Sequence, residues 1–239
     1  MEYEEELNVT KVSRGTIKLW LSCVRSQKLL ISVLSVLSFL SIWTVSLFRQ
    51  KLISAFLMLA VVACHFTVAV LAVPVRVKAA LGTKKSSIWS YQVCFSEGVR
   101  RLLSWILAEI VVIVIAGLGL VLLIVPGITF MLWYLLVPVV IFDDELIGPF
   151  SAMERSKGLV QGKLLKILFS FSVFQVSVIL ALIALYCITL ATSAMSLAIY
   201  ITAALFQALC SELLVTLSLA HLVFLYLSCV ELEQFEEGL

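Results

Sequence analysis

Apolar stretches long enough to cross a lipid bilayer follow one another along most of this chain. A membrane-spanning helix needs about 20 consecutive apolar residues, and such runs begin at Leu29 and continue to Val230. Apolar residues make up 62% of the 239 residues and charged residues 13%, whereas soluble domains are roughly half apolar and a quarter charged. The sequence therefore predicts an all-α polytopic membrane protein. We expect one membrane domain over 1–239, with no room for a separate soluble domain.

Breaks in the apolar runs predict six transmembrane helices arranged as three hairpins. Charges at 49–51 separate the first two helices, and Pro74 is expected to end the second because proline lacks an N–H and clashes with the preceding turn. The pair Pro126-Gly127 predicts a tight turn near 119–127, and Pro138 predicts a kink or local bilayer thinning in the short fourth span. The expected spans are 29–48, 52–73, 102–120, 126–142, 166–190 and 198–228.

The last apolar region is harder to divide. Residues 163–237 contain neither glycine nor proline, and the only polar interruption long enough to turn is 191–196. We expect two long helices there, with three spans inside 166–230 as the alternative.

The distribution of positive charge along the chain predicts the orientation of the protein in the membrane. Fifteen of the 17 Lys and Arg residues fall on the side that holds both termini, and only Arg49 and Lys51 fall on the other. Since an excess of Lys and Arg marks the cytoplasmic side, both termini are expected in the cytoplasm.

Each predicted hairpin is preceded by a segment whose apolar residues lie on one helical face. These segments, at about 14–28, 86–101 and 148–163, end in similar junctions: Lys28-Leu29-Leu30, Arg101-Leu102-Leu103 and Lys163-Leu164-Leu165. Amphipathic helices of this kind lie in the headgroup plane with basic residues toward anionic lipid. We therefore expect a threefold repeat of cytoplasmic interfacial helix plus transmembrane hairpin.

Two stretches resemble a known family. One is the run from Leu120 through Pro126-Gly127 to Asp143, and the other begins at Gly148-Pro149 and continues through Arg155-Ser156 to Lys163. Together they resemble the YciC-type family of uncharacterised bacterial inner-membrane proteins, and the related membrane domain of some glycerophosphoryl diester phosphodiesterases. The resemblance covers about 120–166 closely. It implies a bacterial inner-membrane location, a transmembrane helix opened by Pro-Gly, and a cytoplasmic amphipathic helix after Gly-Pro.

The sequence carries no motif that performs chemistry by itself. Signatures of serine hydrolases, zinc peptidases and phosphate-binding loops do not occur in it, so we predict no enzyme activity, no catalytic residues and no cofactor. The six cysteines include no C-x-x-C pair, and the acidic run 143–145 is read as a solvated loop rather than a metal site. No polybasic tail suggests nucleic acid.

Four ionisable residues at membrane depth are the candidate polar sites: His65, Glu109, Glu212 and His221. A charged group costs about 2.5–3.5 kcal/mol at the bilayer centre, so each is expected to face protein or water. One interpretation is that these residues relay protons or ions, or bind a lipid headgroup. The other is that they only form hydrogen bonds that hold neighbouring helices together. Basic residues expected at lipid headgroups are Lys84, Lys85, Arg100, Arg101, Arg155 and Lys163.

The leading functional hypothesis is a non-enzymatic protein of envelope or lipid homeostasis, or a membrane scaffold. Its expected partners are membrane lipids and a membrane protein. One alternative is a small transporter or channel that uses the intramembrane Glu and His residues. A second alternative is an intramembrane enzyme acting on lipid.

Overall fold

The computed structural model describes residues 9–49, 55–84, 91–143, 148–192 and 197–237. Within these ranges the regular structure is helical, with no β-strand. The helices are α1 (Val9–Ser26), α2 (Lys28–Arg49), α3 (Ala55–Lys84), α4 (Tyr91–Leu122), α5 (Ile124–Trp133), α6 (Val137–Asp143), α7 (Pro149–Val160), α8 (Leu164–Thr192) and α9 (Leu197–Glu237).

Apolarity and length together make this an all-α membrane protein. In the described part, five stretches are long and apolar enough to cross a bilayer: Ala63–Leu81, Ser96–Val121, Ile124–Asp143, Leu164–Thr192 and Ile199–Gln234. A sixth is obtained if the bent pair Arg14–Arg25 and Lys28–Thr44, whose axes differ by 85°, is taken as one broken span. The predicted fold class is therefore confirmed.

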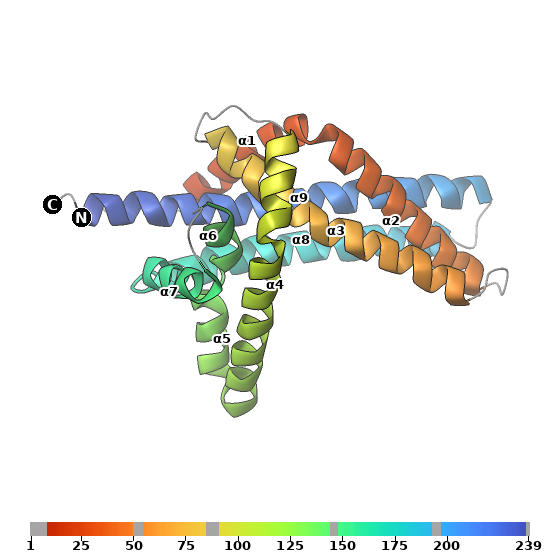
Figure 1. Cartoon of the computed structure of the whole chain (residues 1–239). Helices are drawn as coiled ribbons and strands as arrows, with labels where there is room; N and C mark the ends of the chain where they lie inside the picture. Colours follow the sequence, from red (N-terminus) through yellow and green to blue (C-terminus); the bar gives the residue numbers. More distant parts are fainter. Residues whose placement is uncertain (1–8, 50–54, 85–90, 144–147, 193–196, 238–239) are drawn as a thin grey trace.

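Helix α9 is the centre of the arrangement. Its 41 residues would extend about 62 Å at roughly 1.5 Å per residue, and α1, α2, α3 and α8 all pack along it. In Figure 1, α2, α3 and α8 follow the general direction of α9, whereas the α4–α5 hairpin projects away from them, across that direction. The hairpin is attached mainly through α3, α6 and α7.

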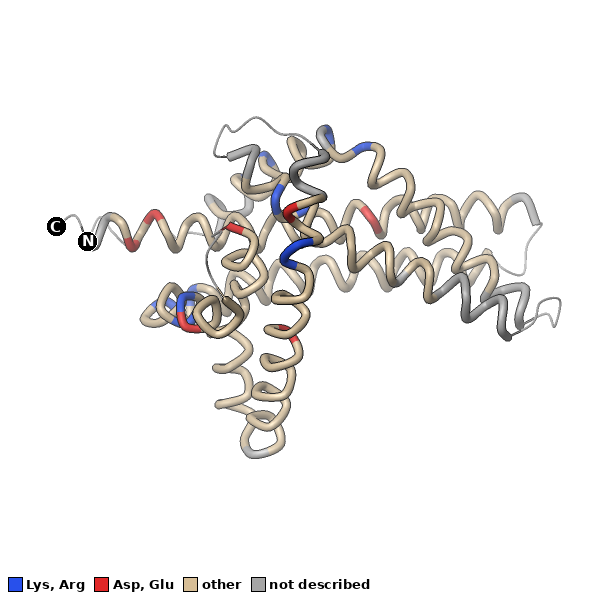
Figure 2. The backbone as a smooth tube through the Cα atoms, viewed as in Figure 1, with Lys and Arg blue, Asp and Glu red and all other residues tan. Residues whose placement is uncertain are grey.

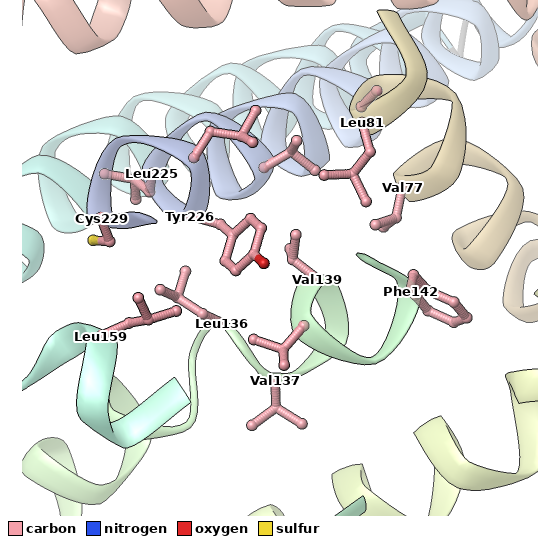
Figure 3. Close-up of a cluster of buried hydrophobic side chains, with 14 of the residues drawn as sticks. Val77, Leu81, Leu136, Val137, Val139, Phe142, Leu159, Leu225, Tyr226 and Cys229 are labelled. Carbon is pink, nitrogen blue, oxygen red and sulfur yellow. The ribbon is translucent and has the colours of Figure 1, made fainter. Parts of the chain in front are cut away.

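The largest buried apolar cluster of the described residues draws on most of the helices, with α3, α6, α7 and α9 among them. Five of the seven residues of α6 are buried, and Leu136 just before it is fully enclosed. Figure 3 shows Val139 of α6 next to Tyr226 of α9 and on the side of Val77 of α3, and it shows Leu136 next to Leu159 of α7. Short α6 is therefore held by its neighbours rather than by its own helical propensity.

Pro74 does not end the second transmembrane helix, so that prediction was wrong. Helix α3 continues through Pro74 to Lys84. The proline is buried against α4, where a Cβ added at Gly98 would lie 2.8 Å from Pro74 Cβ. Proline is tolerated inside membrane helices because neighbouring groups compensate for the lost backbone hydrogen bond.

The segment 86–101 is not a separate interfacial helix, which corrects the second unit of the predicted repeat. Its described part, from Tyr91, is the first portion of the continuous helix α4. Residues 85–90 lie outside the described part. The basic pair Arg100-Arg101 therefore sits within a helix that runs on into the apolar stretch. Nothing in the local sequence stops that helix, because proline does not occur in it.

The other two units keep a separate helix before the hairpin. Helix α1 precedes the α2–α3 hairpin and meets α2 at a sharp bend. Helix α7 covers most of 148–163 and begins with Pro149 in its first turn, the position that proline favours. Gly162 then adopts φ +85° between α7 and α8, a backbone conformation that glycine accepts readily.

The predicted breaks in the fourth and later spans are present. Helix α4 ends at Leu122 and α5 begins at Ile124, inside the interval 119–127 where a turn was expected. The fourth span is broken between α5 and α6, next to Pro138. The region 166–230 contains two helices, α8 and α9, rather than three; residues 193–196 of the predicted interruption lie outside the described part.

Candidate functional site

An ion pair is buried between α3 and α9 within candidate membrane spans. Arg76 donates from Nη2 to Glu212 Oε2 at 2.6 Å, and the two side chains are only 3% and 9% exposed. The residues are 136 positions apart in the sequence. A charge pair with so little contact with solvent is an obvious candidate site, because ionisable groups at this depth are expensive and must find partners.

Helix α2 contributes hydroxyl groups to the same site. Ser38 Oγ donates to Glu212 Oε1 at 2.9 Å and lies 3.1 Å from His65 Nε2 of α3. Ser41 Oγ lies 3.2 Å from His65 Nδ1 and donates to the carbonyl of Leu37. Both carboxylate oxygens of Glu212 are therefore engaged, and we call Ser38, Ser41, His65, Arg76 and Glu212 the polar cluster.

The side chains of the polar cluster differ in solvent exposure, from His65 at one end to Arg76 at the other. The His65 side chain is 26% exposed, and its Nε2 lies 3.8 Å from Glu212 Oε1. Arg76 is almost fully enclosed, and its Nε has no hydrogen-bond partner among the described residues. The cluster thus extends from a partly accessible imidazole, through a serine hydroxyl and a carboxylate, to a buried guanidinium. Each of these groups can exchange or relay a proton except the guanidinium, which stays charged.

Helix geometry brings the cluster together. Because α3 continues past Pro74, Arg76 remains on a helix and faces α9 instead of standing in a loop. His65 and Arg76 are 11 residues apart, about three turns at 3.6 residues per turn, so both occupy the same side of α3. Small neighbours on the buried part of α3, Ala72 and Ala79, leave room for a close approach.

Sequence reasoning identified two members of the polar cluster and missed the cation. His65 and Glu212 were both predicted as intramembrane polar residues, and the structure brings them together. Arg76 was assigned to a cytoplasmic loop because Pro74 precedes it. The available signal was the apolar sequence on both sides of it, since the candidate span continues from Ala63 to Leu81.

His221 belongs to a different contact. Its Nδ1 lies 3.1 Å from Thr16 Oγ1 of α1, and its ring stacks on Phe174 of α8 at 4.0 Å between centroids. Its Nε2 is buried with no hydrogen-bond partner in the described part of the chain. Glu212 and His221 lie on the same helix but contact different neighbouring helices, α3 and α1.

Glu109 also stands apart from the polar cluster. It is half-buried on α4 and accepts a hydrogen bond from Trp105 Nε1 at 3.1 Å, one turn earlier on the same helix. The four predicted intramembrane residues therefore form one pair and two separate contacts. A single catalytic cluster built from all four is not present.

Several basic residues predicted to contact lipid make contacts within the protein. Arg101 Nη1 donates to the carbonyl of Ile141 at 2.7 Å, and Arg155 forms a bidentate ion pair with Glu233 of α9. Arg100 is exposed, and Lys163 is half-buried. Lys84 ends α3, and Lys85 lies outside the described residues. Lipid contact by these residues stays a prediction.

Comparison with known proteins gives no further assignment. No family model, no curated protein and no solved structure matches the chain. The resemblance over 120–166 therefore stays a prediction. Among the described residues, no three His, Cys, Asp or Glu side chains gather in a way that would hold a metal ion.

Proposed function

We propose that this chain is a non-enzymatic, lipid-contacting protein of a bacterial inner membrane that acts in envelope or lipid homeostasis. The observation that carries the proposal is the outward face of α1. Arg14, Lys18 and Arg25 are exposed on this helix, and so are Ile17 and Leu21, at 48% and 56%. Cations interleaved with large apolar side chains suit the boundary between anionic headgroups and acyl chains.

The opposite face of α1 fixes the helix to the protein. Val12, Thr16, Leu19 and Cys23 are buried, and the helix packs on α9 and α3. Trp20 Nε1 also donates to the carbonyl of Leu213 at 3.2 Å. The exposed cations are therefore held in place by a rigid support, which reduces the entropy lost when they bind a lipid.

Charge distribution supports a cytoplasmic location for this face. In Figure 2 the described Lys and Arg residues gather toward the end of the molecule that carries α1 and α7, and the far halves of α8 and α9 show none. Under the positive-inside rule, that end is cytoplasmic. A reporter inserted after Lys51 is then expected outside, and reporters on both termini inside. A C-terminal reporter found outside would overturn the six-span arrangement.

Native mass spectrometry of the gently solubilised protein tests the lipid proposal. We expect anionic phospholipid to be retained at fixed stoichiometry, and retention to fall in the triple variant Arg14→Gln, Lys18→Gln, Arg25→Gln. The control is Lys166→Gln, which removes one exposed cation from α8 and should retain lipid as the wild type does. A wild-type protein that repeatedly carries no lipid would contradict the proposal.

The polar cluster supports a second candidate, a small transporter or channel for protons or ions. A carboxylate, an imidazole and a serine in contact inside the membrane provide groups for a relay. Reconstituted vesicles should then show a flux that Glu212→Gln abolishes, while Glu109→Gln, on a residue outside the cluster, leaves it unchanged. A flux that is equal in the wild type and in Glu212→Gln would eliminate this candidate.

A further inference from the structure

An apolar groove opens between α2 and α3 near the start of α2. It has a volume of about 220 Å³, several times the roughly 30 Å³ that one water occupies in the liquid. Its lining is almost wholly apolar and comes from both helices: Leu29, Leu30, Val33, Val68, Leu71, Ala72 and Val75.

The groove has a fixed floor and an open rim. Leu30, Ala72 and Val75 are buried at 8%, 2% and 2% exposure, and together with Leu34 they form a packed apolar cluster. Leu29 and Val33 on the rim are 71% and 45% exposed. Because the floor is supported from behind, the groove does not depend on the occupant for its shape.

Cationic side chains stand at one end of this groove. Lys28 directly precedes the groove residue Leu29, and Arg25 lies in the last turn of α1, just before the bend that leads into α2; both are exposed. The groove then follows α2 from Leu29 to Val33, deeper into the predicted span. A phospholipid of the cytoplasmic leaflet has the same order, with an anionic headgroup at the membrane surface and apolar chains below it. The cations and the apolar groove therefore match such a lipid in charge and in position along the membrane normal.

We propose that this groove is a binding site for an acyl chain of an anionic phospholipid, whose headgroup is held by Lys28 and Arg25. The site rests on the proposed lipid-contacting function and adds to it a defined position and a headgroup class. It is separate from the polar cluster, whose members do not line the groove. The α1 face described above would attract anionic headgroups generally, whereas the groove holds one chain.

The experiment uses the full-length purified protein and a phosphatidylglycerol that carries a photoactivatable group near the end of one acyl chain. After illumination, digestion and mass spectrometry locate the labelled residues. We expect labelling to concentrate in 29–33 and 68–75, and to be weaker with the matching phosphatidylcholine probe. Labelling spread evenly over the exposed apolar helices would overturn the site.

Two pairs of variants separate the groove from the general surface. Val33→Trp fills the rim and is expected to reduce groove labelling about tenfold, because a few methylenes lose their burial. Its control is Val36→Trp, which changes an exposed residue of the same helix outside the groove and should label normally. Lys28→Glu should abolish the preference for phosphatidylglycerol, and Lys166→Glu, an exposed cation of α8, should preserve it.

The possible failures are distinguishable. If the wild type retains anionic lipid at fixed stoichiometry but Val33→Trp labels as the wild type does, the groove proposal is wrong while the lipid-contacting function stands. If the wild type retains no lipid, both are wrong. If Val33→Cys forms disulfide-linked dimers that the wild type, with its own exposed cysteines, does not form, the groove is occupied by a second copy, and the proposal is overturned.

Discussion

Replacing Arg76 by methionine is expected to lower the free energy of unfolding by about 3–5 kcal/mol. The substitution leaves Glu212 buried at 9% side-chain exposure without the cation at 2.6 Å that now compensates its charge. Denaturation in detergent, followed by circular dichroism, measures the loss. The matched control is Arg100→Met, an exposed arginine of the neighbouring helix α4, for which a change within about 0.5 kcal/mol is expected.

The double variant Arg76→Met, Glu212→Met shows whether the loss comes from the broken pair. Removing both charges also removes the cost of burying them, so the double variant is expected to recover most of the stability lost by either single variant. A double variant as unstable as the sum of the two singles would mean that the charges do not interact in the folded protein. Equal losses in Arg76→Met and Arg100→Met would contradict the prediction directly.

The same double variant also separates the two candidate functions. It keeps α2, α3 and α9 apolar and packed while it eliminates the charged part of the polar cluster. If the cluster only joins helices, lipid retention should survive in a stable double variant, because neither Arg76 nor Glu212 lines the groove between α2 and α3. If the cluster carries protons or ions, the flux should disappear from the same stable protein. The unfolding free energy, the lipid retention and the flux are thus all measured on the same double variant.

Hydropathy predicted the all-α membrane fold class because the bilayer imposes the rule directly. A helix is one of the few structures that satisfies its backbone polar groups in lipid, so a long apolar run has few alternatives. The turn inside 119–127 and the two long helices of 166–230 follow from this constraint, with glycine, proline and polar residues as the only available breaks.

Local sequence signals for a helix end, such as a proline or a pair of charges, were less reliable where contacts with other helices oppose them. Pro74 predicts a helix end from sequence alone, yet Gly98 of α4 packs tightly on it and α3 continues. Arg100-Arg101 suggests a membrane surface, yet Arg101 reaches the carbonyl of Ile141 and α4 runs on. In both cases the residue contacts another helix, whose position the local sequence does not contain.

The polar cluster was predictable in part for a related reason. Single ionisable residues in apolar runs stand out, so His65 and Glu212 could be selected individually. Their partnership with Ser38 and Arg76 requires the packing of α2 and α3 on α9, across 174 and 136 positions. The wrong helix end at Pro74 then removed Arg76 from the candidates. The wrongly predicted helix end at Pro74 therefore left the ion pair between Arg76 and Glu212 out of the predicted site.

Gly127→Ala is expected to destabilise the protein by about 1–3 kcal/mol, the usual cost of overpacking a tight contact. Helices α4 and α5 are joined by Leu123 alone, and a Cβ added at Gly127 would lie 2.6 Å from the backbone nitrogen of Leu120 and 2.7 Å from its Cα. Backbone atoms cannot rotate away as a side chain can, and so short a connection leaves the two helices little freedom to separate. The hairpin must therefore distort.

Gly117→Ala provides the matched control on the same hairpin, because a Cβ added at Gly117 meets no atom within 4 Å. Glycine inside a helix costs roughly 0.5–1 kcal/mol relative to alanine, so this substitution is expected to stabilise the protein slightly. Thermal unfolding of both variants in the same detergent compares two identical chemical changes ten residues apart. Opposite shifts of the unfolding temperature are the expected result. A shift of the same sign and size in both would mean that the close contact between α4 and α5 is absent from the folded protein.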